Sequence, residues 1–454
     1  MKEKEINKKK KSIKEILFED RGNTNFKKIF SEIPEKYVEY AGFGIVILFM
    51  AILIYQEVMR VFFNESIIQR MFYFSGMLAE IFAVFYIVRF FLVEGKGKIQ
   101  IWDVALFIML IWAGISTLLA DDRTTALNGV MLRYDGYYSY LIYASVYVCG
   151  KSVKTKKLRR WILRVMGITI SLLSLMTIPQ TSMEFMDSIG EIGENLYRFG
   201  IYASIYLNTN HFAYVLTIGI MALAGLVVIE EKKVNKVIAL VLMGFNVWAL
   251  IMNDTFGSYV AVMIGMVFFA IIMLVSDKER YKTVITVLTV FIAVSVAMNT
   301  YNNSIGTNFR ITVDDANNFE TNDKGGSGRV GLWKKAIEYI GERPVFGFGP
   351  EGLYDKFLKN EVTNDRPHNE YLQHAVFLGI PALLCYLVAL ISLLITMLKN
   401  LKSLSKEMLV MGAIVFAYCV SAFFGNTLYY TTPYYFIFLG AISACCYKLG
   451  RETD

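Results

Sequence analysis

The chain has 454 residues, of which 55% are hydrophobic and 15% aromatic, and 46 basic against 39 acidic residues give it a net charge of +7. Soluble domains contain about 45–50% apolar residues, whereas here the apolar residues gather in long blocks separated by short polar strips. This pattern excludes a soluble multidomain enzyme, a disordered protein and a membrane barrel of alternating strands. It predicts an all-α, polytopic transmembrane helical bundle.

A membrane-spanning helix needs about 20 mostly apolar residues, and on this criterion the sequence predicts about twelve spans. They lie at residues 41–59, 71–93, 101–120, 136–149, 161–179, 209–230, 237–253, 258–275, 281–299, 374–398, 407–424 and 432–449. The predicted organisation is a basic N-terminal tail, a block of spans one to nine, a large loop, and a block of spans ten to twelve with a short tail. These four parts cover residues 1–40, 41–299, 300–373 and 374–454.

The positions of the basic residues predict how the spans are oriented. Lysine and arginine lie mostly at the ends of apolar blocks, starting with the run from Lys8 to Lys11 and continuing in every second loop. Cytoplasmic loops carry an excess of these residues, so we expect both termini in the cytoplasm. Residues 120–135, 180–208 and 300–373 are then on the outer face of the cytoplasmic membrane. The same distribution indicates contact with the anionic lipids of the bilayer, and no nucleic-acid partner.

The sequence predicts neither a metal site nor a cofactor. Its five cysteines lie inside or at the ends of apolar blocks without a Cys-x-x-Cys spacing, so neither a disulfide framework nor a zinc site is indicated. The adjacent acids Asp314 and Asp315 have no neighbouring acid or histidine that would complete a set of metal ligands.

The loop over residues 300–373 is too long for a simple connection between two spans. Its asparagine-rich part, residues 299–323, predicts an irregular surface loop. Residues 329–341 carry apolar side chains at helical spacing, opposite Lys334, Lys335 and Glu338. This spacing predicts an amphipathic helix that lies on the membrane surface or on the bundle.

His368 and Arg329 are the candidate catalytic residues of this loop. Pro367 disfavours helix before it, so we expect a helix to begin directly after it, with His368 in the first turn. The positive end of the helix dipole would keep that imidazole neutral near pH 7, as a general base requires. Arg329 offers a rigid donor fork that suits a phosphate. The alternatives are a histidine that packs or caps the helix and an arginine on a solvated surface.

Five further residues are candidates for substrate contacts. Trp333 is either an anchor at the membrane interface or a platform for a sugar ring. Arg133 and Asp135, in the outer loop before the fourth span, either contact a sugar or diphosphate or form a structural pair. At the start of the sixth span, Asn210 and His211 either bind substrate or serve as a helix cap and a packed side chain.

Four motifs, in this order along the chain, resemble the O-antigen ligase and O-antigen polymerase superfamily. They are Ser-Gly-Arg-Val-Gly-Leu-Trp (327–333), Arg-Pro-Val-Phe-Gly-Phe-Gly-Pro (343–350), Pro-His-Asn-Glu-Tyr-Leu-Gln (367–373) and Leu-Gly-Ile-Pro (378–381). The stretch Asn-Thr-Asn-His-Phe-Ala (208–213) is similar to the family's Asn-x-Asn-His motif. The large outer loop between the ninth and tenth spans also agrees with the family's layout.

The resemblance implies a GT-C type glycosyltransferase, inverting and independent of metal, that acts on the outer face of the membrane. Such an enzyme transfers a glycan from an undecaprenyl-diphosphate carrier to a hydroxyl of a glycan, lipid or protein acceptor. The family's catalytic arginine and histidine correspond to Arg329 and His368. Asn369 and Glu370 follow the histidine and are expected to contact substrate, and Glu370 could instead orient the histidine or interact with the helix dipole.

The chain departs from the family at one position. Family members carry a further arginine in the seventh or eighth span, but the matching residues 254–259 read Asp-Thr-Phe-Gly-Ser-Tyr. Either Arg198 or Arg133 takes its place, or the diphosphate is held differently.

Two alternative functions remain open. A ligase and a repeat-unit polymerase differ only in their acceptor, and nothing in the sequence separates them. A transporter of lipid-linked glycans would need paired ionisable residues at mid-membrane and inverted repeats. The chain shows no clear symmetry between its halves, which disfavours transport.

Overall fold

The structure is a computed structural model that describes residues 26–63, 68–94, 99–131, 133–197, 202–206, 208–354, 356, 366–429 and 431–444. Over these residues the chain forms helices joined by turns and irregular segments, without strands. The predicted all-α fold class is therefore confirmed for the part of the chain that the structure describes.

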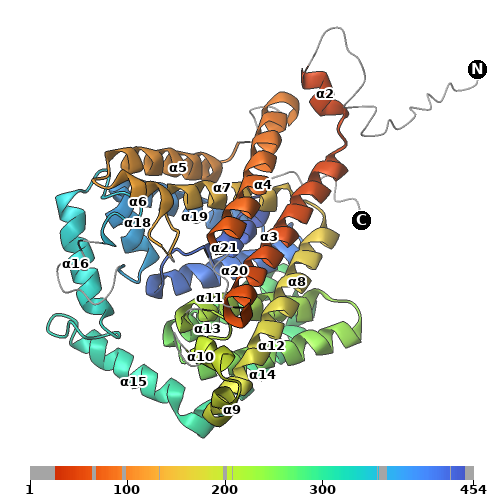
Figure 1. Ribbon diagram of the computed structural model, residues 1–454. Coiled ribbons are helices and arrows are strands. Elements are labelled where there is room, and N and C mark those ends of the chain that lie inside the picture. The colour runs from red at the N-terminus through yellow and green to blue at the C-terminus, as the bar shows by residue number, and fades with distance from the viewer. Residues whose placement is uncertain are drawn as a thin grey trace, which may run out of the picture.

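The helices are numbered as in Figure 1. In chain order they are α2 (Phe26–Glu32), α3 (Glu35–Phe63), α4 (Ile68–Arg89) with the π-helical η1 (Phe90–Glu94), α5 (Ile101–Leu119), α6 (Arg123–Asn128), α7 (Tyr137–Ser152), α8 (Lys156–Ser174), η3 (Leu175–Thr177), η4 (Pro179–Thr181), α9 (Met183–Ser188), α10 (Glu191–Tyr197), α11 (Thr209–Ile229), α12 (Lys233–Asn253), α13 (Phe256–Ser276), η5 (Lys278–Arg280), α14 (Tyr281–Asn302), α15 (Ser304–Asn317), α16 (Arg329–Glu342), α18 (Glu370–Leu378), α19 (Ile380–Lys399), α20 (Lys406–Ser421), η6 (Ala422–Phe424) and α21 (Thr432–Ser443).

Nine helical segments among the described residues are long and apolar enough to cross a membrane. They coincide with the predicted spans two, three and five to eleven, while α3, α7 and α21 correspond to the first, fourth and twelfth. α7 has 16 residues and α21 has 12. At 1.5 Å per residue, both are shorter than the hydrocarbon core of about 30 Å. The full count of twelve spans stays a prediction.

α11 forms the centre of the bundle. Every residue from His211 to Ile229 is buried, and the helix packs against α8, α12, α13 and α20. A helix that is apolar on all its faces fits such a fully enclosed position. α7 and α21 make a second close contact, where a Cβ on Gly440 would lie 1.9 Å from the carbonyl oxygen of Tyr147. Glycine at this position allows the two backbones to approach each other.

The predicted tenth span is divided into α18 and α19. The break lies at Gly379, which has φ +89°, a conformation that glycine adopts readily. The backbone N–H of Gly349 donates to the carbonyl of Phe377 over 2.8 Å, and that of Ile380 donates to the carbonyl of Pro344, also over 2.8 Å. The turn at residues 344–349 therefore satisfies backbone groups that the break leaves free.

The large loop is more helical than the sequence predicted. The expectation of an irregular loop over residues 299–323 is wrong, because α14 continues to Asn302 and α15 follows it. Asn303, with φ +52°, makes the corner between the two helices, and Oδ1 of Asn299 accepts a hydrogen bond from Gly306 N–H over 2.8 Å. Asparagine tolerates the left-handed conformation and bonds local backbone groups, so this composition suits a helix–helix corner.

The predicted amphipathic helix is confirmed as α16. Its inward face buries Val330, Leu332, Ala336 and Tyr339, whereas the apolar Ile337 is 59% exposed. The helix packs on α18, and Figure 1 shows α15 and α16 along one side of the bundle. The described part of this loop that forms α15 and α16 is therefore helical, and α16 packs on α18.

We predict that Gly347→Ala destabilises the protein by at least about 2 kcal/mol. Gly347 has φ +64°, and a Cβ there would lie 2.4 Å from the carbonyl oxygen of Phe377. Thermal unfolding in detergent measures the effect, with Gly341→Ala as the control because no atom lies within 4 Å of a Cβ at Gly341. Equal melting temperatures for the two variants would contradict the proposed role of this turn.

Candidate functional site

The candidate site lies where the N-terminal ends of α11 and α16 meet the segment before α18. Arg329, the first residue of α16, donates a hydrogen bond from Nη2 to Oδ1 of Asn210 over 3.1 Å. His368 lies within electrostatic range of Arg329, Arg133 and Arg366. Both predicted catalytic residues are therefore in one region, although they come from separate parts of the chain.

The sequence predicted His368 in the first turn of a helix, and this prediction is wrong. α18 begins at Glu370, and Oδ1 of Asn369 caps it by accepting hydrogen bonds from the N–H groups of Tyr371 and Leu372 at 3.0 and 3.1 Å. Asparagine is a preferred residue at this position, which explains the later start. His368 itself has φ +49°, in the left-handed region that favours glycine.

The imidazole of His368 is neutral at physiological pH. Burial, together with the charges of Arg329, Arg133 and Arg366, lowers its pKa to about 3. The sequence predicted a neutral histidine but gave the helix dipole as the cause. The structure replaces that cause with desolvation and a group of arginines, both of which disfavour the imidazolium form.

The start of α11 holds Asn210 in position for Arg329. The alternative considered for Asn210, a helix cap, is excluded because Asn208 caps the helix. Oδ1 of Asn208 accepts hydrogen bonds from the N–H and Nδ2 of Asn210 at 2.8 and 2.9 Å. The side-chain oxygen of Asn210 is thereby available to Arg329. His211 is buried beside it and lies within electrostatic range of His368.

Arg60 is a further basic residue of this region that the sequence analysis missed. Its Nη2 donates a hydrogen bond to the carbonyl oxygen of Ile205 over 2.6 Å, and it lies within electrostatic range of His211. α3 leads from the predicted inner side to the predicted outer side, where arginine is less common. That unusual position was the sequence signal that could have identified it.

Three other predicted contact residues have different outcomes. Arg133 is half-buried and lies within electrostatic range of His368. Trp333 is half-buried, and its buried Nε1 has no hydrogen-bond partner among the described residues. Arg198, one of the two proposed replacements for the missing arginine, lies outside the described residues.

A network of buried charges lies beside His368, and the sequence analysis missed it. Arg366 is 1% exposed, and its Nη1 donates to the carbonyl oxygen of Thr427 at 2.7 Å and to Oδ2 of Asp135 at 3.3 Å. Its Nη2 forms an ion pair with Glu351. We call Arg366, Asp135 and Glu351 the buried charge network. It joins the segment before α18 to three distant parts of the chain.

Asp135 is fully enclosed by hydrogen-bond donors. The hydroxyl of Tyr143 donates to Oδ1 at 2.7 Å, while Nε2 of Gln373, at 3.2 Å, and the hydroxyl of Thr427 donate to Oδ2. Burial raises the pKa of Asp135, and the charge of Arg366 opposes this shift. Of the two roles considered for Asp135, its contacts favour the structural one, with Arg366 as partner in place of Arg133.

Three residues around this network have strained backbone conformations. Tyr134, Glu351 and His368 have φ values of +48°, +56° and +49°. The backbone of each residue is in the left-handed region, which favours glycine. For residues other than glycine this conformation costs of order 1 kcal/mol or more. Such conformations persist where the surrounding contacts over-determine the backbone, and here the ion pairs of the buried charge network supply those contacts.

Glu370 is enclosed by protein groups and is 1% exposed. Its Oε1 accepts a hydrogen bond from the hydroxyl of Tyr386 at 3.0 Å, and its Oε2 accepts one from the hydroxyl of Tyr418 at 3.4 Å. Nε2 of His374 lies 3.6 Å from Oε1. These contacts occupy both oxygens of Glu370 and fix the start of α18 to α19 and α20. Among the described residues, no group of three or more His, Cys, Asp or Glu side chains could hold a metal ion.

We predict that Asp135→Asn lowers the stability of the protein by about 3 kcal/mol or more, because it leaves Arg366 buried without its full complement of charge. Thermal unfolding in detergent is the measurement. Asp323→Asn is the control, since Asp323 is 72% exposed and pairs with Lys334 at 2.6 Å on the surface, where such pairs contribute little. A melting temperature of Asp135→Asn equal to that of the control would refute the structural role.

We also predict that His368 makes the protein less stable as the pH falls from 6.5 to 3. The pKa of His368 is about 3 in the folded chain and about 6.5 in an unfolded chain. Between these values only the unfolded state binds the proton, so acidification favours unfolding. Denaturation midpoints measured from pH 7 to pH 4 will fall less steeply for His368→Asn than for the wild type. Parallel curves would show that His368 is not buried in its neutral form.

The comparisons with known proteins give one family match. No curated protein matches the chain. Residues 238–387 match the family model described as O-antigen ligase. This range contains His368 and the helix α16, which carries Arg329 and Trp333. The match confirms, for this part of the chain, the resemblance seen in the sequence motifs.

Proposed function

We propose that this protein is a membrane glycosyltransferase that transfers a glycan from an undecaprenyl-diphosphate carrier to an acceptor hydroxyl on the outer face of the cytoplasmic membrane. The observation that carries the proposal is the neutral His368 within electrostatic range of three arginines, inside a region that matches the O-antigen ligase family. A neutral imidazole can accept a proton, and the arginines can bind a diphosphate.

In the proposed reaction, Nδ1 or Nε2 of His368 takes the proton of the acceptor hydroxyl. The hydroxyl oxygen attacks the anomeric carbon from the face opposite the diphosphate and forms the new glycosidic bond. The bond from the anomeric carbon to the diphosphate oxygen breaks, and that oxygen leaves with the electron pair. Arg329 and Arg133 stabilise the charge that develops on the departing diphosphate, most effectively in a site with little water.

The charges of this site link donor binding to the strength of the base. Without an anion, the arginines lower the pKa of His368. A bound diphosphate would offset their positive charge, and its own negative charge favours the imidazolium, so the pKa of His368 rises towards the working pH. The histidine is then an effective base only when the donor is in place.

The opposite end of the bundle supports the proposed orientation. There, Arg164 pairs with Glu230 at 2.6 Å, and Arg160 pairs with Glu407 at 2.8 Å. These basic residues lie at the end of the helices remote from His368, as expected for the cytoplasmic side. We therefore place His368 on the outer side and both termini in the cytoplasm. Ligase and polymerase share this chemistry and differ only in the acceptor hydroxyl.

The proposal predicts transfer from a synthetic polyprenyl-diphosphate glycan in nanodiscs with EDTA present. We expect kcat to fall by about 10²–10⁴-fold in His368→Ala, the range for a lost general base, and by a similar factor in Arg329→Ala. Arg310→Ala is the matched control, because Arg310 is an exposed arginine on α15 in the same loop.

Three results would contradict this proposal. Equal rates for His368→Ala and the wild type would move the base elsewhere. Loss of activity on addition of EDTA would exclude a metal-independent reaction. Equal losses in Arg310→Ala and Arg329→Ala would show a general effect of charge in the loop and no specific contact by Arg329.

A further inference from the structure

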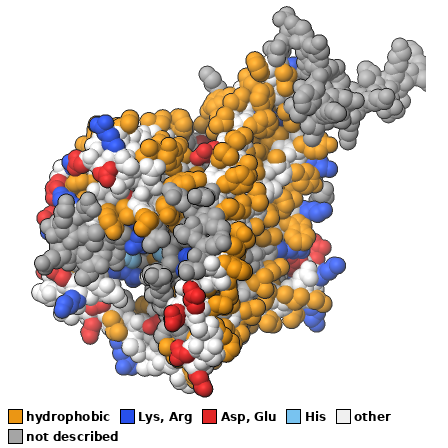
Figure 2. Space-filling model, in the orientation of Figure 1, with side chains coloured by type: hydrophobic (Ala, Val, Ile, Leu, Met, Phe, Trp, Pro, Cys, Tyr) orange, Lys and Arg blue, Asp and Glu red, His pale blue; other side chains and the backbone are white. Residues whose placement is uncertain are grey.

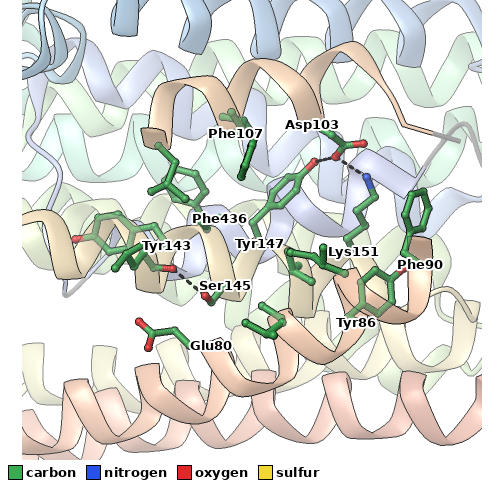
Figure 3. A pocket seen from close by; sticks show the side chains of 18 of the residues that line it. Glu80, Tyr86, Phe90, Asp103, Phe107, Tyr143, Ser145, Tyr147, Lys151 and Phe436 are labelled. Atoms are coloured by element: carbon green, nitrogen blue, oxygen red, sulfur yellow. Dashed lines mark hydrogen bonds and ion pairs between the residues drawn. The ribbon is translucent and has the colours of Figure 1, made fainter. Parts of the chain in front are cut away.

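A large apolar cavity lies between α4, α5 and α7, and neither His368 nor the three arginines around it line this cavity. Its volume is about 640 Å³, within the range of about 300–1,000 Å³ typical of ligand pockets. Figure 3 shows it from close by, with side chains from α4, α5 and α7 around it and Phe436 of α21 at one side. Almost all of its wall is apolar, so it suits a hydrocarbon ligand and not a glycan.

The cavity is bordered on the bilayer side by exposed apolar residues. Val84 and Ile87 of α4 are 64% and 43% exposed, and Phe107 of α5 is 62% exposed. Figure 2 shows hydrophobic side chains over this face of the molecule, along α3 and α4. Exposed apolar side chains on membrane helices face lipid tails. A lipid chain can therefore enter the cavity sideways from the bilayer.

One end of the cavity is closed by polar contacts. Asp103 of α5 forms an ion pair with Lys151 of α7, and the hydroxyl of Tyr147 donates a hydrogen bond to Oδ1 of Asp103 at 2.7 Å. In Figure 3 these groups lie together on the side away from Tyr143 and Glu80. Lys151 is at the C-terminal end of α7, which is the predicted cytoplasmic end.

The other end of the cavity lies beside the buried charge network. Tyr143 lines the cavity, and its hydroxyl donates to Asp135 of the buried charge network at 2.7 Å. Arg133 comes from the loop before α7 and lies within electrostatic range of His368. α7 therefore connects a basic, partly buried site at its N-terminal end with an apolar cavity along its length. An amphiphile with an anionic head and a long apolar chain fits both parts.

We propose that this cavity binds the hydrocarbon chain of the polyprenyl lipid that carries the glycan donor. The inference rests on the proposed function and assigns the lipid part of the donor to α4, α5 and α7. The diphosphate would lie near Arg133 and Arg329, where the N-terminus of α7 adds the positive end of its dipole. The chain would run along α7 towards the Asp103–Lys151 pair.

A photoreactive lipid tests this assignment without relying on activity. The probe is a polyprenyl phosphate with a diazirine in its chain, in nanodiscs of phosphatidylglycerol and phosphatidylethanolamine. We expect crosslinks to peptides of α4, α5 and α7. We expect Ala144→Trp, which fills the cavity from α7, to reduce them by about tenfold or more. Ala293→Trp is the matched control, because Ala293 is exposed on α14 and does not line the cavity.

The comparison with a second probe identifies the source of the lipid chain. A phosphatidylglycerol with the same diazirine should label these peptides much less than the polyprenyl probe does. Equal labelling by the two probes would overturn the proposal, because the cavity would then hold ordinary bilayer lipid. Labelling that persists in Ala144→Trp would also overturn the proposal, provided that Ala144→Trp and Ala293→Trp have similar melting temperatures and are therefore both folded.

A transfer assay separates this proposal from the proposed function. Donors with the same diphosphate glycan and either a short or a long polyprenyl chain are compared in the two tryptophan variants. Ala144→Trp should raise KM by about tenfold for the long-chain donor alone. If crosslinking succeeds and no transfer occurs with either donor, the cavity assignment holds and the proposed function fails. Transfer with unchanged KM values in Ala144→Trp overturns the cavity assignment alone.

Discussion

The ion pairs of Arg366 with Asp135 and Glu351 are the constraint on which the geometry of the candidate site depends. Burying three charges is expensive, and the cost is offset only when each one has partners with good geometry. Here the hydroxyl of Tyr143, the amide of Gln373 and groups of Thr427 complete the coordination. Arg366 is two residues before His368. The contacts of Arg366 with Asp135, Glu351 and Thr427 therefore determine the position of the imidazole.

The charges around His368 fall into two groups. In the buried charge network, Arg366 is paired with two carboxylates, whereas Arg329 and Arg133 lie outside the network and their positive field reaches the imidazole. Arg329 donates to a neutral amide oxygen, that of Asn210, and forms no ion pair with the residues that the structure describes. Such a site favours an anion with several oxygens. The structure thus separates an ion-paired scaffold from a positively charged surface.

Much of the fold could be predicted from the sequence, because the bilayer imposes long apolar helices whose backbone groups are satisfied internally. α7, with 16 residues, is largely buried and is shorter than a typical membrane span. The order of the motifs identified Arg329 and His368. It did not identify Arg60, Arg366 or Glu351, since their importance arises from contacts between residues far apart in the chain. The sequence analysis placed the start of this helix directly after Pro367, whereas it begins at Glu370. Asn369 and Pro367 are competing start signals, and Asn369 is the one that caps the helix.

The contacts of Thr427 have a consequence for the order in which the fold is completed. Arg366 and Asp135 both bond to this residue, which follows α20 in the chain. A growing polypeptide that has not yet reached Thr427 lacks the group that completes the buried charge network. The network can therefore close only after α20 has been synthesised.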